Sequence, residues 1–393
     1  MADVEIGIGK SGRRAYGFDD IAIVPSRRTR DPEDVSLAWE IDAYRFELPL
    51  MASPMDGVVS PDLAVALGKL GGLGVLDLEG VWTRYDDPEP LLEEMSNLPA
   101  DRVVDRMREI YSKPIEADLI TARVKQVRDS GVTVAAALTP QRTVQFAQTV
   151  IDAGVDLFVI QGTVVSAEHV SSRTEPLNLK RFIAELDVPV IVGGCATYQS
   201  ALHLMRTGAA GILVGVGPGQ ANTTRAVLGL GVPMATSIAD AAGARRDYLD
   251  ESGGRYVHVI ADGGMRTGGD IAKAIAMGAD AVMMGSALAR ASEAPGRGWH
   301  WGHASHHPVL PRGTRVRTAP VATLEEVLLG PAATDDGSTN LFGGLRRAMA
   351  MTGYSSIKEF QKVDVMVAPA MRTEGKDLQR AQGLGTYASL SAT

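Results

Sequence analysis

The stretch VHVIADGGMRTGGDIAKAIAMGADAVMMGSALA, residues Val257–Ala289, decides the fold class of this chain. It opens with a β-branched, apolar run over Tyr256–Ala261, which predicts a buried strand. The run stops at the sequence DGG (262–264), and apolar residues at helical spacing follow. A second buried strand is predicted over Ala281–Met284, and it ends at Gly285-Ser286. Strand, helix and strand form a parallel unit, so both glycine-rich strand ends lie at one edge of the sheet.

The two glycine-rich strand ends indicate a binding site for an anion. Backbone N–H groups without a side chain can approach a phosphate closely, and two such turns on neighbouring strands form a cradle for it. In a (β/α)8 barrel, the loops after the last two strands are the usual place for a phosphate site. The stretch therefore predicts a ligand that carries a phosphate.

The same device of helix, glycine turn and strand recurs along the chain, in ALGKLGGLGV, VIDAGVDLFV, LMRTGAAGILV and AIAMGADAVMM. This alternation predicts parallel βαβ units, and eight of them close into a (β/α)8 TIM barrel of the α/β class. A doubly wound open sheet is the competing fold, although it rarely needs eight units in a row. The predicted strands are Leu48–Ala52, Leu73–Leu76, Val132–Leu138, Leu157–Gln161, Pro189–Val192, Gly211–Gly215, Tyr256–Ala261 and Ala281–Met284.

Two segments are longer than this repeat requires. Residues 77–130 follow the second strand and have a charged helical pattern, which predicts a helical insert. Residues 290–320 are rich in Gly, Pro, His and Trp. A long loop over the C-terminal face of a barrel is more often a lid or specificity element than a connection without function, and we expect this segment to resemble a lid. We expect residues 1–370 to form one barrel domain with a C-terminal helical extension, and residues 371–393 to form a loose, disordered tail.

Composition and charge exclude several classes of function. The net charge of −8 and the low isoelectric point argue against a nucleic-acid or acidic-membrane partner. The single cysteine, Cys195, excludes a disulfide framework and a multi-cysteine metal site. No apolar run approaches the length of a membrane span, and the first residues lack the apolar core of a signal peptide. We therefore expect a cytoplasmic protein without a dedicated metal site.

Seven motifs, in order along the chain, together resemble the IMP dehydrogenase/GMP reductase family. No segment is long enough for the family's pair of regulatory cystathionine-synthase-like domains, so the chain is similar to the compact IMP dehydrogenase-related branch. The motifs are YGFDDIAIVP (16–25), MASPMD (51–56), GGLGVL (71–76), GPGQANTTR (217–225), the stretch from ADGG to MMGS (261–286), EAPG (293–296) and GGLRRAMAMTGY (343–354).

The resemblance implies a bound purine nucleoside 5′-monophosphate, a role for NAD or NADP, and a homotetramer. Ser53 and Met55 would contact the nucleotide, with Met55 against the base, and Asp262 would accept hydrogen bonds from the ribose hydroxyls. The phosphate would be held by Gly264, Gly285 and Ser286. Gly217, Gly219 and Gln220 would shape the catalytic loop, whose carbonyls could line a monovalent-cation site, and Gln161 and Gly162 would lie on the nicotinamide side.

The chain also departs from the family at the positions that perform its chemistry. Relatives use a thiolate that attacks C2 of the purine before hydride leaves to the nicotinamide. Asn222 occupies that position, and an amide is not a nucleophile. Gln220 replaces the loop serine, Gln161 a carboxylate, and Leu213 an arginine. The sequence GWHWGHASHHPVLPRGT (298–314) stands where relatives carry a mobile flap.

Several residues allow a functional and a structural interpretation. Cys195 follows the fifth strand and could face the ligand end of the barrel, but a lone cysteine is usually a small core residue. Thr224 keeps a hydroxyl of the catalytic loop, but Thr223 and Thr224 equally suit the N-cap of a following helix. His300, His303, His306 and His307 could reach a substrate phosphate, act as a base or bind zinc, or do nothing at the surface. The stretch GVGPGQ imitates a dinucleotide-binding loop, but the glycine spacing is incomplete.

Two classes of function follow from these observations. The first is an NAD(P)-linked oxidoreductase acting on a purine nucleotide, with water adding directly and a histidine or Arg312 replacing the flap. The second is a non-catalytic nucleotide sensor or assembly partner that has kept the phosphate cradle. The intact glycine turns suit both, whereas Asn222 and the missing flap favour the second.

Overall fold

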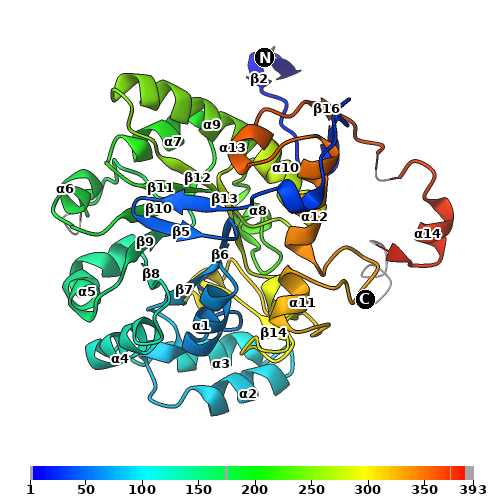
Figure 1. The fold of residues 1–393 in the computed structure, drawn as a ribbon. Helices are drawn as coiled ribbons and strands as arrows, with labels where there is room; N and C mark the ends of the chain where they lie inside the picture. The colour runs from blue at the N-terminus through cyan, green and yellow to red at the C-terminus, as the bar shows by residue number, and fades with distance from the viewer. Residues whose placement is uncertain (1–2, 173–175, 372, 386–393) are drawn as a thin grey trace.

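A closed barrel of eight parallel strands forms the centre of the molecule (Figure 1). The computed structural model describes residues 3–172, 176–371 and 373–385. The strands follow one another around the barrel in chain order, and the last closes it against the first. They are β6 (Leu50–Ala52), β7 (Leu73–Asp77), β8 (Ala135–Leu138), β9 (Leu157–Gln161), β10 (Val190–Cys195), β11 (Gly211–Val214), β12 (His258–Asp262) and β13 (Ala281–Met284). The predicted (β/α)8 fold is confirmed, and each predicted strand overlaps one of these.

Helices surround the barrel, and local chemistry explains where they begin and end. The first starts at Pro61, whose preceding residue Ser60 accepts a hydrogen bond from the backbone N–H of Leu63. The helix before β9 stops at Gly154, which has a φ of +90° that favours glycine. The helices are α1 (Pro61–Lys69), α4 (Ala117–Arg128), α5 (Pro140–Ala153), α6 (Leu179–Ala184), α7 (Tyr198–Met205), α8 (Thr224–Leu228), α9 (Met234–Glu251) and α10 (Gly268–Ala276).

Two apolar cores hold the barrel together. The larger one fills the layer between the strands and the helices. The smaller one fills the barrel interior and includes Leu213. The hairpin of β4 (Trp39–Ile41) and β5 (Tyr44–Phe46) joins the inner core and closes the end where the strands begin. The opposite end, where the strands terminate, carries the large cavity, as is usual for this fold.

The segment predicted as an insert contains three helices with two different roles. The third, α4, packs between α1 and α5 as a helix of the barrel itself. The other two, α2 (Glu89–Asn97) and α3 (Val103–Ile110), are the true addition. Their apolar faces form a separate small core with Val81, Tyr111 and Trp301. Since Trp301 belongs to residues 290–320, the insert supports that segment.

Residues 290–320, which we name the cover segment, are docked onto the barrel. They contain the antiparallel pair β14 (Trp299–His300) and β15 (Val316–Arg317) and the short helix η5 (His303–His306). The indole N–H of Trp301 donates to the Tyr111 hydroxyl at 2.8 Å, and that hydroxyl donates to Asp56 Oδ2 at 2.5 Å. A Cβ at Gly57 would lie 2.9 Å from the Trp299 carbonyl oxygen, so only glycine admits this approach. The cover segment is therefore part of the packed structure.

Segments near the two ends of the described chain pair with each other outside the barrel. Strand β3 (Ile21–Ile23) pairs with β16 (Val365–Val367), and within residues 371–393 the structure has a short helix, while 386–393 lie outside the described residues. No helix among the described residues is long and apolar enough to cross a membrane. The remaining elements are β1 (Val4–Gly7), β2 (Lys10–Gly12), η1 (Phe18–Asp20), η2 (Pro32–Asp34), η3 (Val81–Thr83), η4 (Leu288–Arg290), α11 (Leu324–Leu328), α12 (Leu341–Met351), α13 (Ile357–Phe360) and α14 (Asp377–Ala381).

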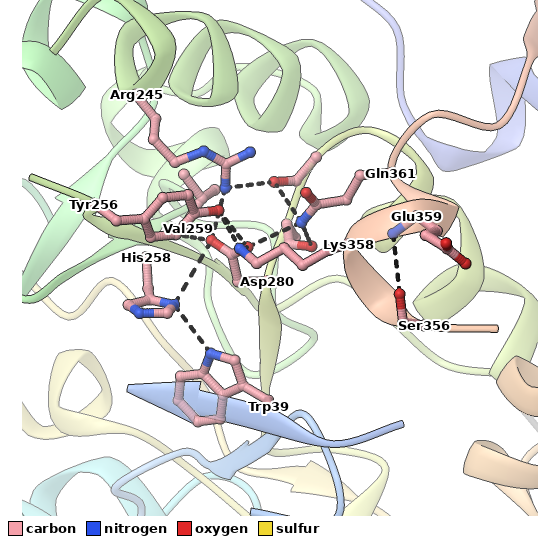
Figure 2. A network of polar contacts seen from close by, with 12 residues as sticks. Trp39, Arg245, Tyr256, His258, Val259, Asp280, Ser356, Lys358, Glu359 and Gln361 are labelled. Carbon is pink, nitrogen blue, oxygen red and sulfur yellow. Dashed lines mark hydrogen bonds and ion pairs between the residues drawn. The ribbon is translucent and has the colours of Figure 1, made fainter. Parts of the chain in front are cut away.

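Asp280 anchors the C-terminal helix α13 to the end of the barrel where the strands begin (Figure 2). Its side chain is fully buried, and Oδ2 lies 2.6 Å from Arg245 Nη1. Oδ1 accepts a hydrogen bond from Gln361 at 2.9 Å and forms an ion pair with Lys358. Burial raises the pKa of Asp280, but the two cations lower it more, to about 2. The buried charge is therefore fully compensated, and this face of the barrel has a structural role.

Candidate functional site

A cavity of about 1160 Å³ lies at the end of the barrel where the strands terminate. Its wall is built from the ends of β6, β9, β11, β12 and β13 and from the cover segment. Among the predicted site residues, all of which the structure describes, Thr224 alone is absent from this wall. The others that line it are Ser53, Met55, Gln161, Gly162, Gly217, Gly219, Gln220, Asn222, Asp262, Gly264, Gly285 and Ser286. Folding thus gathers side chains that lie up to 233 residues apart, from Ser53 to Ser286.

The two glycine turns predicted for a phosphate lie on the neighbouring strands β12 and β13. Gly263 and Gly264 have φ angles of +81° and +83°, a backbone conformation that favours glycine. A Cβ at Gly285 would lie 2.7 Å from Met55 Sδ, so a side chain at this position would displace Met55. Both turns therefore expose bare backbone to the cavity, which allows the close approach that an anion needs.

Asp262 provides the carboxylate of the cavity wall at the end of β12. Its Oδ2 accepts a hydrogen bond from Gln161 Nε2 at 3.0 Å, which joins the predicted ribose residue to a predicted cofactor residue. Burial raises the pKa of Asp262 to about 6, while the bond from Gln161 lowers it. The group is therefore mostly ionised at neutral pH and suited to accept hydrogen bonds from ligand hydroxyls.

Asn222, which the resemblance predicts to lie at the position of the family nucleophile, makes structural hydrogen bonds in this protein. Its side-chain Oδ1 accepts a hydrogen bond from the backbone N–H of Thr224 at 2.7 Å, which caps the start of α8. Its backbone forms a bridge with Gly313 of the cover segment, and the N–H of Thr223 donates to the Arg312 carbonyl at 2.7 Å. The loop over residues 217–225 is thus held by the Asn222 side chain and by the cover segment.

Thr224 and Cys195 both lie away from the cavity. Thr224 is fully buried at the first position of α8, and its hydroxyl has no hydrogen-bond partner among the described residues. The structure therefore places the Thr224 side chain outside the cavity wall, and its catalytic role stays a prediction. Cys195 is buried between the barrel and its helices, with Sγ 3.5 Å from the Leu213 carbonyl oxygen. Burial raises the pKa of its thiol to about 12, and of the two interpretations of Cys195 the structure agrees with a small core residue.

The four histidines of the cover segment have different environments. His300 is fully buried and contacts Ser286 and Thr318. His306 stacks on Tyr111 with ring centroids 3.7 Å apart, and burial, followed by the charge of His303, lowers its pKa to about 3. His307 lines the cavity and accepts hydrogen bonds from backbone N–H groups through Nδ1. Among the described residues, no group of three or more His, Cys, Asp or Glu is placed to hold a metal ion.

His303 is the charged histidine of the cavity wall. Its Nδ1 lies 3.2 Å from Asp77 Oδ2, and its Nε2 lies 3.8 Å from Glu79 Oε2. Burial lowers the pKa of His303, but these carboxylates raise it more, to well above its usual value. His303 and Asp77 both line the cavity. The two carboxylates therefore hold His303 as an imidazolium at the cavity wall, with both ring nitrogens directed toward them.

Asp77 and Glu79 are functional candidates that the sequence analysis missed, because they were assigned to the helical insert. Both acids follow the buried run of β7 in the sequence DLEG, and polar residues directly after a barrel strand are the available signal. Thr163, after β9, was also missed, and its hydroxyl accepts a hydrogen bond from Arg312 Nη1 at 3.1 Å. Their partners, His303 and Arg312, lie on the cover segment.

The fold and the cavity define a (β/α)8 barrel with a large cavity at the C-terminal ends of its strands, the place of active sites in barrel enzymes. Residues 15–305 match the family model described as IMP dehydrogenase / GMP reductase domain. The chain therefore belongs to the IMP dehydrogenase/GMP reductase family, in its compact form.

Known relatives span nearly the whole chain. An uncharacterized oxidoreductase of Mycobacterium tuberculosis is 54% identical over 372 residues, covering 93% of this chain and 99% of that protein. An inosine-5′-monophosphate dehydrogenase of Methanocaldococcus jannaschii is 27% identical, covering 92% and 94%. The crystal structure of an IMP dehydrogenase/GMP reductase-like protein from Corynebacterium glutamicum is similar with a TM-score of 0.88 and 49% identity, covering 93% of this chain and 98% of that one.

Proposed function

We propose that this protein is an oxidoreductase that binds a purine nucleoside 5′-monophosphate in the barrel cavity and works with NAD or NADP. The observation that carries the proposal is the assembly of Ser53, Met55, Asp262 and the two glycine turns on one cavity wall. Family membership and the oxidoreductase names of relatives support the class of reaction. The homotetramer and a monovalent cation at the loop carbonyls stay predictions.

The nucleotide half of the cavity matches the chemistry of such a ligand. The backbone of Gly264 and Gly285 and the Ser286 hydroxyl would hold the phosphate, as donors to an anion. Asp262 would accept hydrogen bonds from ribose hydroxyls, and the Met55 side chain, which lies against Gly285, would pack on the base. Each role uses a group that lines the cavity.

The size and the far wall of the cavity fit a second ligand. Single-ligand pockets measure roughly 300–1,000 Å³, and this cavity of about 1160 Å³ is larger. Gln161, Gly162 and Thr163 line the wall beyond Asp262, with Arg312 bonded to Thr163. These residues would hold a nicotinamide dinucleotide, which donates or accepts a hydride when bound.

The chemistry of this chain differs from the covalent route of its relatives. No thiolate is available, because Asn222 caps a helix and Cys195 is buried with a pKa of about 12. The purine nucleotide is therefore bound without a covalent bond to the protein. His303 lies on the cavity wall and is held by Asp77. It would act as the general acid or base that donates or accepts the proton accompanying hydride transfer.

Stopped-flow absorbance of the purified protein tests the proposal directly. IMP, XMP and GMP are each mixed with the oxidised and the reduced forms of NAD and NADP. We expect a change in nicotinamide absorbance that requires the nucleotide and that persists after treatment with a thiol alkylator. In His303→Gln the rate should fall by about 10²-fold or more, as expected for loss of a general acid, while nucleotide binding is retained. Absence of turnover with every pair would contradict the catalytic proposal.

A non-catalytic nucleotide sensor is the second candidate, and the geometry at Asn222 favours it. The side chain at the former nucleophile position is used as a cap, and the loop is tied to the cover segment through Gly313 and Arg312. A sensor would bind nucleoside monophosphates in calorimetry without any change in nicotinamide absorbance. That pair of results separates the two candidates.

A further inference from the structure

A buried chain of hydrogen bonds connects the cover segment to the cavity. His300 has no exposed surface, and each of its two ring nitrogens forms a hydrogen bond with a side-chain hydroxyl. Its Nε2 lies 2.7 Å from Ser286 Oγ, and its Nδ1 lies 2.7 Å from Thr318 Oγ1. Ser286 lines the cavity directly after β13, whereas His300 does not. The orientation of the Ser286 hydroxyl at the cavity wall therefore depends on its hydrogen bond with the buried His300.

His300 is neutral, and this restricts how the chain can be arranged. Burial lowers the pKa of His300 to about 4, so the ring carries one N–H at neutral pH. In the first arrangement Nε2–H donates to Ser286, Thr318 donates to Nδ1, and the Ser286 proton is free for the cavity. In the second, Nδ1–H donates to Thr318, Ser286 donates to Nε2, and only oxygen lone pairs of Ser286 face the cavity.

The same Ser–His distance could belong to a nucleophilic serine, but the surroundings contradict this. A base that takes a serine proton needs a pKa near the working pH and is normally oriented by a carboxylate at the other nitrogen. His300 has a pKa of about 4, and a threonine hydroxyl occupies the position of the carboxylate. The histidine is suited to orient the serine hydroxyl and not to deprotonate it.

We propose that His300, as its Nε2–H tautomer fixed by Thr318, is a positioning residue that keeps Ser286 a hydrogen-bond donor to the phosphate of the bound nucleotide. An anion in the cavity favours the arrangement in which the Ser286 proton points toward it. The inference rests on the proposed nucleotide ligand. It gives the cover segment a role in phosphate recognition through a residue that does not touch the phosphate.

The placement of β14 supports this role. Gly57, in the loop after β6, allows β14 to approach so closely that a Cβ there would lie 3.1 Å from His300 Cα. The N–H of Thr318 donates to the Gly298 carbonyl at 2.7 Å, which fixes the hydroxyl beside His300. His300 and Thr318 are thus held in register by the β14–β15 pair, while Ser286 is held by the barrel. The hydrogen-bonded chain Ser286–His300–Thr318, which we name the relay, thus connects the end of β13 to the β14–β15 pair.

Calorimetry with IMP and with inosine, which lacks the phosphate, tests the relay. His300→Phe should weaken IMP binding by about tenfold or more, the usual effect of losing one hydrogen bond to a charged group, and should leave inosine binding unchanged. His300→Gln keeps an N–H near the Nε2 position and should restore most of the affinity. In the Ser286→Ala background, His300→Phe should cause no further loss, because the two residues act as a unit.

Nitrogen NMR of histidine-labelled wild-type protein provides a test that needs no variant. We expect His300 in the IMP complex to carry its proton on Nε2, with Nδ1 unprotonated. A proton on Nδ1 in the complex would overturn the inference. So would equal losses for IMP and inosine in His300→Phe, or IMP affinity equal to wild type. If wild-type protein binds none of IMP, XMP and GMP, the proposed function fails, and the relay fails with it.

Discussion

Replacing Asp262 with asparagine should stabilise the ligand-free protein and weaken nucleotide binding. Burial raises the pKa of this carboxyl from 3.8 to about 6, so its ionised form is less favourable in the folded protein than in the unfolded chain. Asparagine has nearly the same shape without the charge. Gln161, which donates to Asp262 Oδ2 at 3.0 Å, can donate equally to the asparagine oxygen. The substitution therefore removes the cost of the charge and keeps the hydrogen bond.

The magnitude follows from the pKa. A tenfold change in the acid dissociation constant is worth about 1.4 kcal/mol, so a rise from 3.8 to about 6 corresponds to about 3 kcal/mol. Asp262 faces the cavity, where water screens part of the charge, and we expect a gain of about 1–3 kcal/mol at pH 7.5. The folded pKa lies above the unfolded one, so the stabilising effect of the protonated carboxyl is fully present below pH 3.8. It is lost as the pH rises through 6.

Urea unfolding at pH 4, 5, 6 and 7.5 measures this difference, with IMP calorimetry on the same samples. The asparagine variant should be more stable than wild type at pH 7.5 and nearly equal to it at pH 4, and its affinity for IMP should be lower. Asp335→Asn, at an exposed aspartate, is the matched control and should change neither quantity. Equal or lower stability of the Asp262 variant at pH 7.5 would refute the reasoning, as would a gain that does not depend on pH.

Three further substitutions test other parts of the molecule. Asp280→Asn leaves Arg245 buried without its counterion and should lower the free energy of unfolding by about 3–5 kcal/mol, measured in urea. Gly285→Glu should abolish IMP binding in calorimetry with an unchanged circular dichroism spectrum, because a Cβ there would lie 2.7 Å from Met55 Sδ and the carboxylate repels phosphate; unchanged affinity would contradict the phosphate site. Asn222→Cys should give at most a burst of about one reduced cofactor per protomer with IMP and NAD, because no flap activates water to release the product; fast steady-state turnover would contradict this.

Much of the site could be predicted because its signals are local. Gly263, Gly264 and Gly285 follow buried strands within a few residues, and parallel strands bring such ends to one edge. The burial of Thr224 could not be predicted, because the position of a side chain at a helix start, toward the cavity or away from it, depends on how the loop is packed.

The sequence by itself determined the barrel and the edge at which its glycine turns meet, because both follow from residue type and short-range periodicity. Only the tertiary structure decided what the histidines of the cover segment do. His303 meets Asp77 across 226 residues of chain and is charged, whereas His300, three positions earlier, is enclosed beside Ser286 and is neutral. The charge of an imidazole depends on the water and the carboxylates around it, and folding alone determines which of these it meets.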